Sequence, residues 1–262
     1  MAINFNYQQY LGVIRTPNIS ANNSRSNIRF GNYQPADTFE SNSPKKYTSE
    51  ISIRNLANSN PKIAQILQSV NAPYSINMET LNHLLTTHAT ATQEISEGII
   101  QNLPFSLKQK ANAKAIQDAA YLHDIGKVFI PEEITNKNGK LTPQETEIMH
   151  KHSELGYELL KNTNIDPKVL FLIRNHHQNA QKSGYPKVDN KFFADLDLQI
   201  LSIADKYSAL TEARPYKKPL TREQALTIIR SEVREGKINP LVFNALVAYT
   251  DDKILQKTKS LS

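Results

Sequence analysis

The chain contains no cysteine among its 262 residues. This absence excludes disulfide bonds, thiolate zinc sites and cysteine nucleophiles. A metal ion bound to this protein would therefore be held by nitrogen and oxygen ligands from histidine, aspartate or glutamate.

Long apolar runs are also lacking. No stretch of about 18 consecutive apolar residues occurs, which predicts that the chain has no membrane-spanning helix. The first residues, Met1-Ala2-Ile3-Asn4, provide neither the basic nor the apolar region of a signal peptide. We therefore expect a cytoplasmic protein that does not associate with a membrane.

Strand alternation is absent as well, and helical periodicity dominates from about residue 61. Apolar residues recur every three or four positions over 78–99, which predicts one long amphipathic helix. A capping box that begins at Ser106 predicts a helix that runs to about His123. Further helix starts are predicted at Thr142, Asp166 and Thr221, after Asp197, and at Asn239. The pattern as a whole predicts an all-α fold.

The composition divides the chain into three parts. Residues 1–45 are rich in Asn and Ser and lack any sustained period, which predicts a flexible extension. A short helical lead-in is expected over 46–75, followed by a single helical domain over 76–255. The formal net charge of +6 favours anionic partners such as phosphates or nucleotides.

Histidine and aspartate residues fall on the apolar faces of the predicted helices. These residues are His88, His123, Asp124, His152, His176, His177 and Asp205. A single histidine on such a face is usually a hydrogen-bonded core residue. Burying five histidines and two aspartates without partners would cost about 1–3 kcal/mol for each group. A shared metal site would satisfy all of them together, so the pattern predicts one.

Seven ligands exceed what one octahedral ion needs when it keeps a position open for substrate. We therefore expect two divalent ions, either iron or manganese, with zinc, nickel and magnesium left open. Asp124 can bridge the two ions through its two oxygens, while His123 serves one of them. Two ions about 3.5–4 Å apart can hold a hydroxide between them for attack on a phosphodiester.

Four motifs resemble, in order, those of the HD-GYP subfamily of the HD phosphohydrolases. The segment His123–Lys127 resembles the HD signature. Residues 176–186 have the spacing of the HHxxxxxxGYP motif, and 203–211 resemble the family's aspartate helix. Arg214-Pro215-Tyr216 matches its RPY element. The resemblance spans roughly residues 80–250 and implies a helical bundle with a buried binuclear metal site.

The resemblance also implies roles for individual residues. The seven residues above would be the metal ligands, with Asp124 and Lys127 as the catalytic pair. Lys127 would contact a substrate phosphate, Arg214 would bind a phosphate or a guanine, and Tyr185 would stack on a base. Gly184 would let the backbone approach the ligand. Each of these four residues also has a simpler interpretation, as a solvated lysine, an ion-pair partner, a packing residue or a turn.

The chain departs from the family pattern at five positions. Gln178 replaces the usual glutamate, Gln181 the aspartate, and Lys182 the first glycine of the GYP loop. Ser208 stands where the family often has aspartate. Leu84 occupies the position where three-metal members have a glutamate ligand, which favours two ions.

The leading hypothesis is a metal-dependent phosphodiesterase that hydrolyses a cyclic dinucleotide, either cyclic di-GMP or a related molecule. One alternative is an HD phosphohydrolase that acts on mononucleotides or another phosphoester. Others are a catalytically silent nucleotide-binding sensor and an oxygenase with a di-iron site. No stable nucleic-acid binding is expected. The sequence does not identify the base of the substrate, the number of bonds cleaved, the oligomeric state or a protein partner for residues 1–45.

Overall fold

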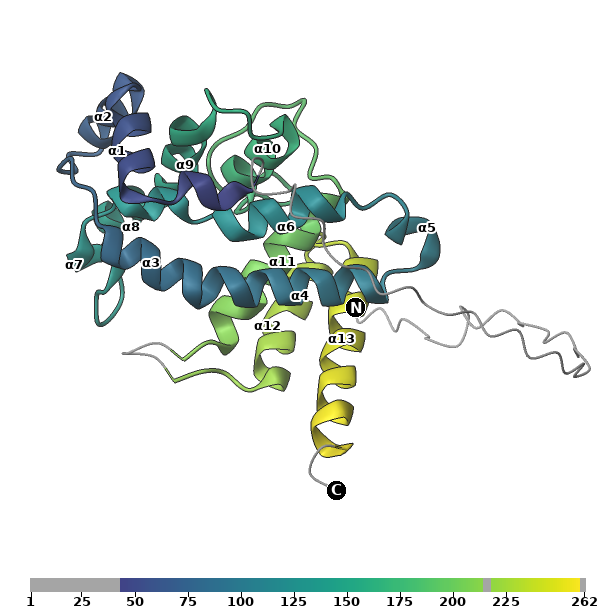
Figure 1. Ribbon diagram of the computed structural model, residues 1–262. Helices are drawn as coiled ribbons and strands as arrows, with labels where there is room; N and C mark the ends of the chain where they lie inside the picture. The colour runs from purple at the N-terminus through teal and green to yellow at the C-terminus, as the bar shows by residue number, and fades with distance from the viewer. Residues whose placement is uncertain (1–42, 214–217, 260–262) are drawn as a thin grey trace, which may run out of the picture. The chain divides into compact units, whose positions relative to one another are not determined.

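The computed structural model describes residues 43–213 and 218–259 (Figure 1). Within these residues the regular structure is entirely helical, which confirms the predicted all-α class. No described helix has the length and apolar character needed to cross a membrane. Most of the predicted extension lies outside the described residues, as does Arg214.

The described chain forms a bundle of helices, most of them joined by short connections, with a longer one over residues 176–195 between α10 and α11. In order, the elements are η3 (Pro44–Tyr47), α1 (Glu50–Asn58), α2 (Pro61–Ser69), α3 (Met78–Thr86), α4 (His88–Asn102), α5 (Phe105–Lys108), α6 (Ala113–Leu122), η4 (Ile125–Phe129), α7 (Glu132–Thr135), α8 (Pro143–His150), α9 (His152–Leu160), α10 (Pro167–Asn175), α11 (Leu196–Thr211), α12 (Arg222–Arg234) and α13 (Pro240–Lys259).

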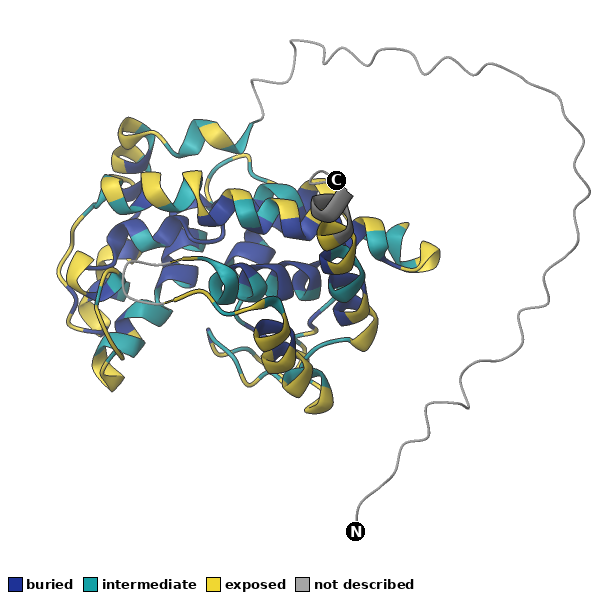
Figure 2. Ribbon diagram, turned by 90° about the horizontal axis from the view of Figure 1, so that it is seen from below, coloured by how far each residue is buried: buried dark blue, intermediate teal, exposed yellow. Residues whose placement is uncertain are grey.

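Helix α4 lies at the centre of the bundle and packs against α6, α11 and α13. Helix α10 packs in turn against α6 and α9. The buried residues lie on the inward faces of these helices, while exposed residues cover the outside (Figure 2). Ile99, Ile116 and Leu201, which are fully buried, illustrate the packing of α4, α6 and α11 around one apolar core.

The expectation of one continuous helix over 78–99 is wrong, because the chain breaks at Thr87. This residue has φ −114° and ψ −80°, outside the helical region. The Thr87 hydroxyl donates to the carbonyl of His83 at 2.7 Å, and the Thr86 hydroxyl donates to that of Asn82 at 2.9 Å. Such bonds compete with the helical ladder. As a result, α3 ends at Thr86 and His88 becomes the first residue of α4.

The predicted helix from Ser106 to about His123 is also wrong. The short helix α5 begins at Phe105 without a capping side chain, and the longer helix α6 starts only at Ala113. The side chain of Asn112 accepts a hydrogen bond from the Ala115 backbone N–H at 3.1 Å, which caps the new start. Helix α6 therefore ends at Leu122, immediately before the His-Asp pair.

Other predicted helix starts are confirmed. Thr142 and Thr221 each form a complete capping box, and the Asp166 side chain caps α10. Helix α13 begins at Pro240, directly after Asn239. The helix expected after Asp197 begins slightly earlier, because the Asp195 side chain accepts from the Leu198 N–H at 3.1 Å.

Gly126 allows η4 to contact the first turn of α9. A Cβ atom at this position would lie 1.9 Å from the His152 carbonyl oxygen and 2.5 Å from the Gly156 backbone nitrogen. Neither backbone atom can move aside without displacing α9. We expect Gly126→Ala to destabilise the protein by about 1–3 kcal/mol or more, measured by urea denaturation.

Gly98→Ala provides a graded control. A Cβ atom there would meet the ring of Tyr249, a partly buried side chain rather than backbone, and alanine favours the helix by about 1 kcal/mol. The loss should therefore be smaller than for Gly126→Ala. Equal stability of Gly126→Ala and the unaltered protein would contradict the close packing of η4 on α9.

Candidate metal centre

The seven predicted ligands are brought together by helix ends and by one helix interior. His88 begins α4, His123 follows α6 and Asp124 comes next, His152 begins α9, His176 and His177 follow α10, and Asp205 lies within α11. Six of the seven residues are buried, and His177 is partly buried.

The two aspartates lie among the imidazoles. The carboxylate of Asp124 has one oxygen 3.5 Å from His123 Nε2 and 3.7 Å from His88 Nε2. Its other oxygen lies 3.4 Å from His152 Nε2. Asp205 Oδ1 lies 3.0 Å from His88 Nε2 and 3.7 Å from His123 Nε2, while its Oδ2 is 3.8 Å from His177 Nδ1. Each carboxylate is thus positioned to bind the same metal ion as the neighbouring histidines.

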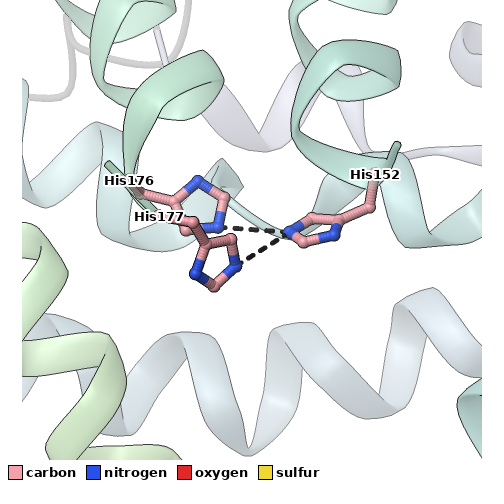
Figure 3. Close-up of side chains that lie close together, drawn as sticks. All are labelled: His152, His176 and His177. Carbon is pink, nitrogen blue, oxygen red and sulfur yellow. Dashed lines mark hydrogen bonds between the residues drawn. The ribbon is translucent and has the colours of Figure 1, made fainter. Parts of the chain in front are cut away.

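Three imidazoles meet on one side of this cluster (Figure 3). His152 Nε2 lies 3.2 Å from both His176 Nε2 and His177 Nε2. The Nδ1 atoms of His152 and His176 lie 2.7 Å from the carbonyl oxygens of Met149 and Ile173, so these Nδ1 atoms carry the protons. The two Nε2 atoms then face each other with lone pairs only, an arrangement that a cation between them would stabilise.

Two atoms at the centre of the cluster are buried without hydrogen-bond partners. They are His123 Nε2 and Asp124 Oδ1. His123 Nδ1 lies 2.8 Å from the Ala120 carbonyl oxygen, which leaves Nε2 as an acceptor. Leaving a buried polar atom unpaired costs about 1–3 kcal/mol, so the donor set fits a bound cation.

Protonation in the cluster also suits a metal ion. Burial lowers the pKa of His152 to about 4 and that of His176 to about 3, so both rings are neutral near pH 7. Burial would raise the pKa of Asp124, but the Lys127 ammonium and the surrounding histidines hold it well below its usual range. Neutral imidazoles and ionised carboxylates are the forms that bind metals.

His88 has different surroundings. Burial lowers its pKa, but hydrogen bonds to Asp205 and Glu212 outweigh burial and raise the pKa to about 9. Its Nδ1 lies 3.2 Å from both Ser208 Oγ and Glu212 Oε2. Glu212 was not predicted from the sequence, because this residue lies just beyond the end of α11. The one feature of the sequence that points to Glu212 is its position four residues after Ser208.

Overlapping groups of these residues could each hold a metal ion. In each group, three ligand atoms lie within 4.8 Å of one another. The groups are His152, His176 and His177; His88, His123 and Asp205; and His123, Asp124 and His176. The described structure therefore contains donor clusters suited to metal binding.

Lys127 joins the cluster from η4. Its Nζ lies 2.7 Å from Asp124 Oδ2, and 18 % of its side chain is exposed. Lys127 is therefore close enough to neutralise Asp124 and accessible enough to meet an anion from solvent. Arg214, the other predicted phosphate contact, lies outside the described residues.

The GYP loop lies beside the cluster. The ring of Tyr185 stacks on His150 with centroids 3.7 Å apart, and its centroid lies 4.5 Å from that of His177. A Cβ atom at Gly184 would lie 1.9 Å from the His177 carbonyl oxygen, so glycine permits a close approach within the protein itself. The predicted stacking of Tyr185 on a base stays a prediction.

The departures in this loop have structural roles. Gln178 is buried, donates from Nε2 to the Pro186 carbonyl at 2.6 Å and accepts from the Gly184 N–H at 3.2 Å. Gln181 donates to the Glu235 carbonyl. Lys182 has φ +58°, the left-handed region that favours glycine, the residue the family has at this position. Gln178 and Gln181 therefore hold the loop in place without contributing ligands, and Lys182 donates from Nζ to the Asn190 carbonyl at 2.6 Å.

A bound metal should stabilise the folded protein. After chelator treatment, manganese at 100 times its dissociation constant should add about 2.7 kcal/mol to the free energy of unfolding. Asp124→Asn should abolish most of this gain, whereas His83→Gln, at an exposed histidine outside the cluster, should retain it. Thermal denaturation with and without manganese measures both. An equal gain for Asp124→Asn would place the metal elsewhere.

The metal-free protein should also lose stability in mild acid. In the unfolded chain His152 and His176 bind protons near pH 6.5, whereas in the folded protein they do so only at about 4 and 3. Their folded pKa values are lowered, so stability falls as the pH drops below 6.5, by about 1.4 kcal/mol per pH unit for each histidine. His88 has a folded pKa of about 9, so its contribution opposes this slope between pH 7 and about 6.5 and stays constant at lower pH, where it is protonated in both states. Urea denaturation between pH 7 and 4.5 tests this slope, and a flat profile would contradict it.

Several curated proteins resemble this chain. A 3′3′-cGAMP-specific phosphodiesterase of Vibrio cholerae is 32 % identical over 61 % of the chain and 36 % of its own length. The cyclic di-GMP phosphodiesterase response regulator RpfG of Xanthomonas campestris is 37 % identical over 51 % and 36 %. A cyclic di-GMP phosphodiesterase of Thermotoga maritima is 39 % identical over 44 % and 32 %. The matched regions span about a third of each relative.

A solved structure has a related fold. The HDG"Y"P protein Bd1817 of Bdellovibrio bacteriovorus aligns with 81 % of this chain and 68 % of its own, with a TM-score of 0.52 and 15 % identity. At this identity the likeness concerns the fold alone. The model of the HD domain family matches residues 73–242, which include all seven residues of the cluster. This match confirms the membership that the ordered series of motifs predicted, and the chain belongs to the HD domain family.

Proposed function

We propose that this protein is a metal-dependent phosphodiesterase that hydrolyses a cyclic dinucleotide, cyclic di-GMP or a related molecule. The observation that carries the proposal is the convergence of five histidines and two aspartates, with lone pairs and carboxylate oxygens directed inward, beside the accessible Lys127. The names of the relatives supply the substrate class, since they describe phosphodiesterases of cyclic di-GMP and cyclic GMP-AMP.

Two divalent ions, iron or manganese, suit the donor set better than one. His152, His176 and His177 form one group of three nitrogen donors, and His88, His123 and Asp205 form another. Asp124 has one oxygen near His152 and the other near His88 and His123, so its carboxylate is placed to serve both groups. When bound, such a pair would supply an activated water and would stabilise negative charge on the phosphate.

The protein's own residues would bind and orient the substrate. Among the described residues, Lys127 is an accessible cation in contact with Asp124. Its ammonium can move from that carboxylate to a phosphate oxygen of the substrate. The stacked rings of Tyr185 and His150 lie next to His177 and would form one wall of the substrate site. Arg214 is proposed as a second phosphate or guanine contact on the resemblance alone.

Hydrolysis of a nucleotide panel tests the proposal. Manganese- or iron-loaded protein should open cyclic di-GMP, cyclic GMP-AMP or cyclic di-AMP, and Asp124→Asn should abolish that activity. Cleavage confined to mononucleotides would favour the alternative phosphohydrolase. Two ions bound without cleavage of any compound would favour the nucleotide-binding sensor.

Lys127→Ala should lower kcat by about 10²–10³-fold, because it removes a preorganised charge from the reacting phosphate. Lys62→Ala provides the control, since Lys62 is an exposed lysine on α2 outside the cluster. Metal content measured on the same samples separates loss of phosphate binding from loss of the ions. Unchanged kcat in Lys127→Ala would remove this residue from the reaction.

A further inference from the structure

The Nδ1 atoms of the buried histidines differ in what they contact. Those of His123, His152 and His176 each lie 2.7–2.8 Å from the carbonyl oxygen of the residue three positions earlier. A backbone carbonyl can only accept, so in each case Nδ1 must carry the proton and Nε2 must present the lone pair. The main chain thus fixes three ligands in the metal-binding tautomer.

His88 is oriented by side chains instead. It is the first residue of α4, and its ring contacts the last turns of α11. There Ser208 Oγ and Glu212 Oε2 both lie 3.2 Å from His88 Nδ1. Ser208 lies in the last turn of α11 and Glu212 is its C-cap residue, so the end of this helix brings both side chains to the same ring atom.

The two contacts are not chemically equivalent. A serine hydroxyl can either donate or accept, so Ser208 permits either tautomer of His88. An ionised carboxylate can only accept, so Glu212 requires a proton on Nδ1. Asp205 Oδ1, 3.0 Å from Nε2, accepts the proton on that atom in the metal-free protein, so Nε2 is the nitrogen that can release its proton and present a lone pair to a metal ion. The side chain of Glu212 is 21 % exposed, partly removed from solvent screening.

We propose that Glu212 is the positioning residue of this centre: its carboxylate on His88 Nδ1 sets the tautomer and orientation in which His88 binds a metal. This inference rests on the metal centre of the proposed function and adds a residue that touches neither the ion nor the substrate. A partner of this kind orients a ligand and raises its basicity, and its loss typically lowers metal affinity 10–100-fold.

Metal affinity, measured by competition with a fluorescent chelator, tests the proposal on the full chain. Glu212→Ala should weaken manganese binding by about 10–100-fold, and Glu212→Gln, which keeps an accepting oxygen but not the charge, by less. Glu133→Gln, an exposed glutamate on α7, should bind as the unaltered protein does. Thermal denaturation of the metal-free variants verifies folding, and Glu212→Gln carries the test if Glu212→Ala fails to fold.

A double-mutant cycle with His88→Ala separates positioning from a general effect of charge. If Glu212 acts through the imidazole, removing the glutamate should change manganese affinity less than twofold once His88 is absent. An undiminished effect in that background would overturn the proposal, as would unaltered affinity in Glu212→Ala. If the unaltered protein bound no manganese, the metal centre and this inference would both be overturned.

Discussion

The structure depends on a buried cluster of imidazole nitrogens and carboxylate oxygens whose lone pairs are directed toward one another. Main-chain carbonyls hold the protons of His123, His152 and His176 on Nδ1, so their Nε2 atoms converge without protons on Asp124 and on one another. Such a cluster is unfavourable by itself and favourable around a cation. The packing of α4, α6, α9, α10 and α11 is therefore tied to metal binding.

Helix ends, more than helix faces, position the cluster. His88 begins α4 because the helix is interrupted at Thr86 and Thr87. His123 and His176 follow the last residues of α6 and α10. At the ends of α6 and α10 the backbone carbonyls three residues earlier accept from the imidazoles of His123 and His176. The same ends bring Asp124 and His177, the next residues along the chain, into the cluster at a different angle.

The sequence predicted the all-α class and the seven residues of the cluster, because apolar periodicity and ordered motifs are local signals. It did not predict the break at Thr87 or the new start at Asn112, where side-chain bonds to the backbone override periodicity. Glu212 was missed because its role depends on how the end of α11 packs on α4. Gln178 was identified as a departure, but its hydrogen bonds to the GYP loop depend on how that loop folds.

We propose that the convergent cluster is a binuclear metal site. Crystals of the protein grown with manganese, with anomalous diffraction data collected near the manganese edge, test it most directly. We expect two anomalous peaks about 3.5–4 Å apart, with Asp124 between them and nitrogen ligands from both groups of histidines. A single peak would contradict the binuclear site, and no peak within the cluster would contradict the metal centre itself.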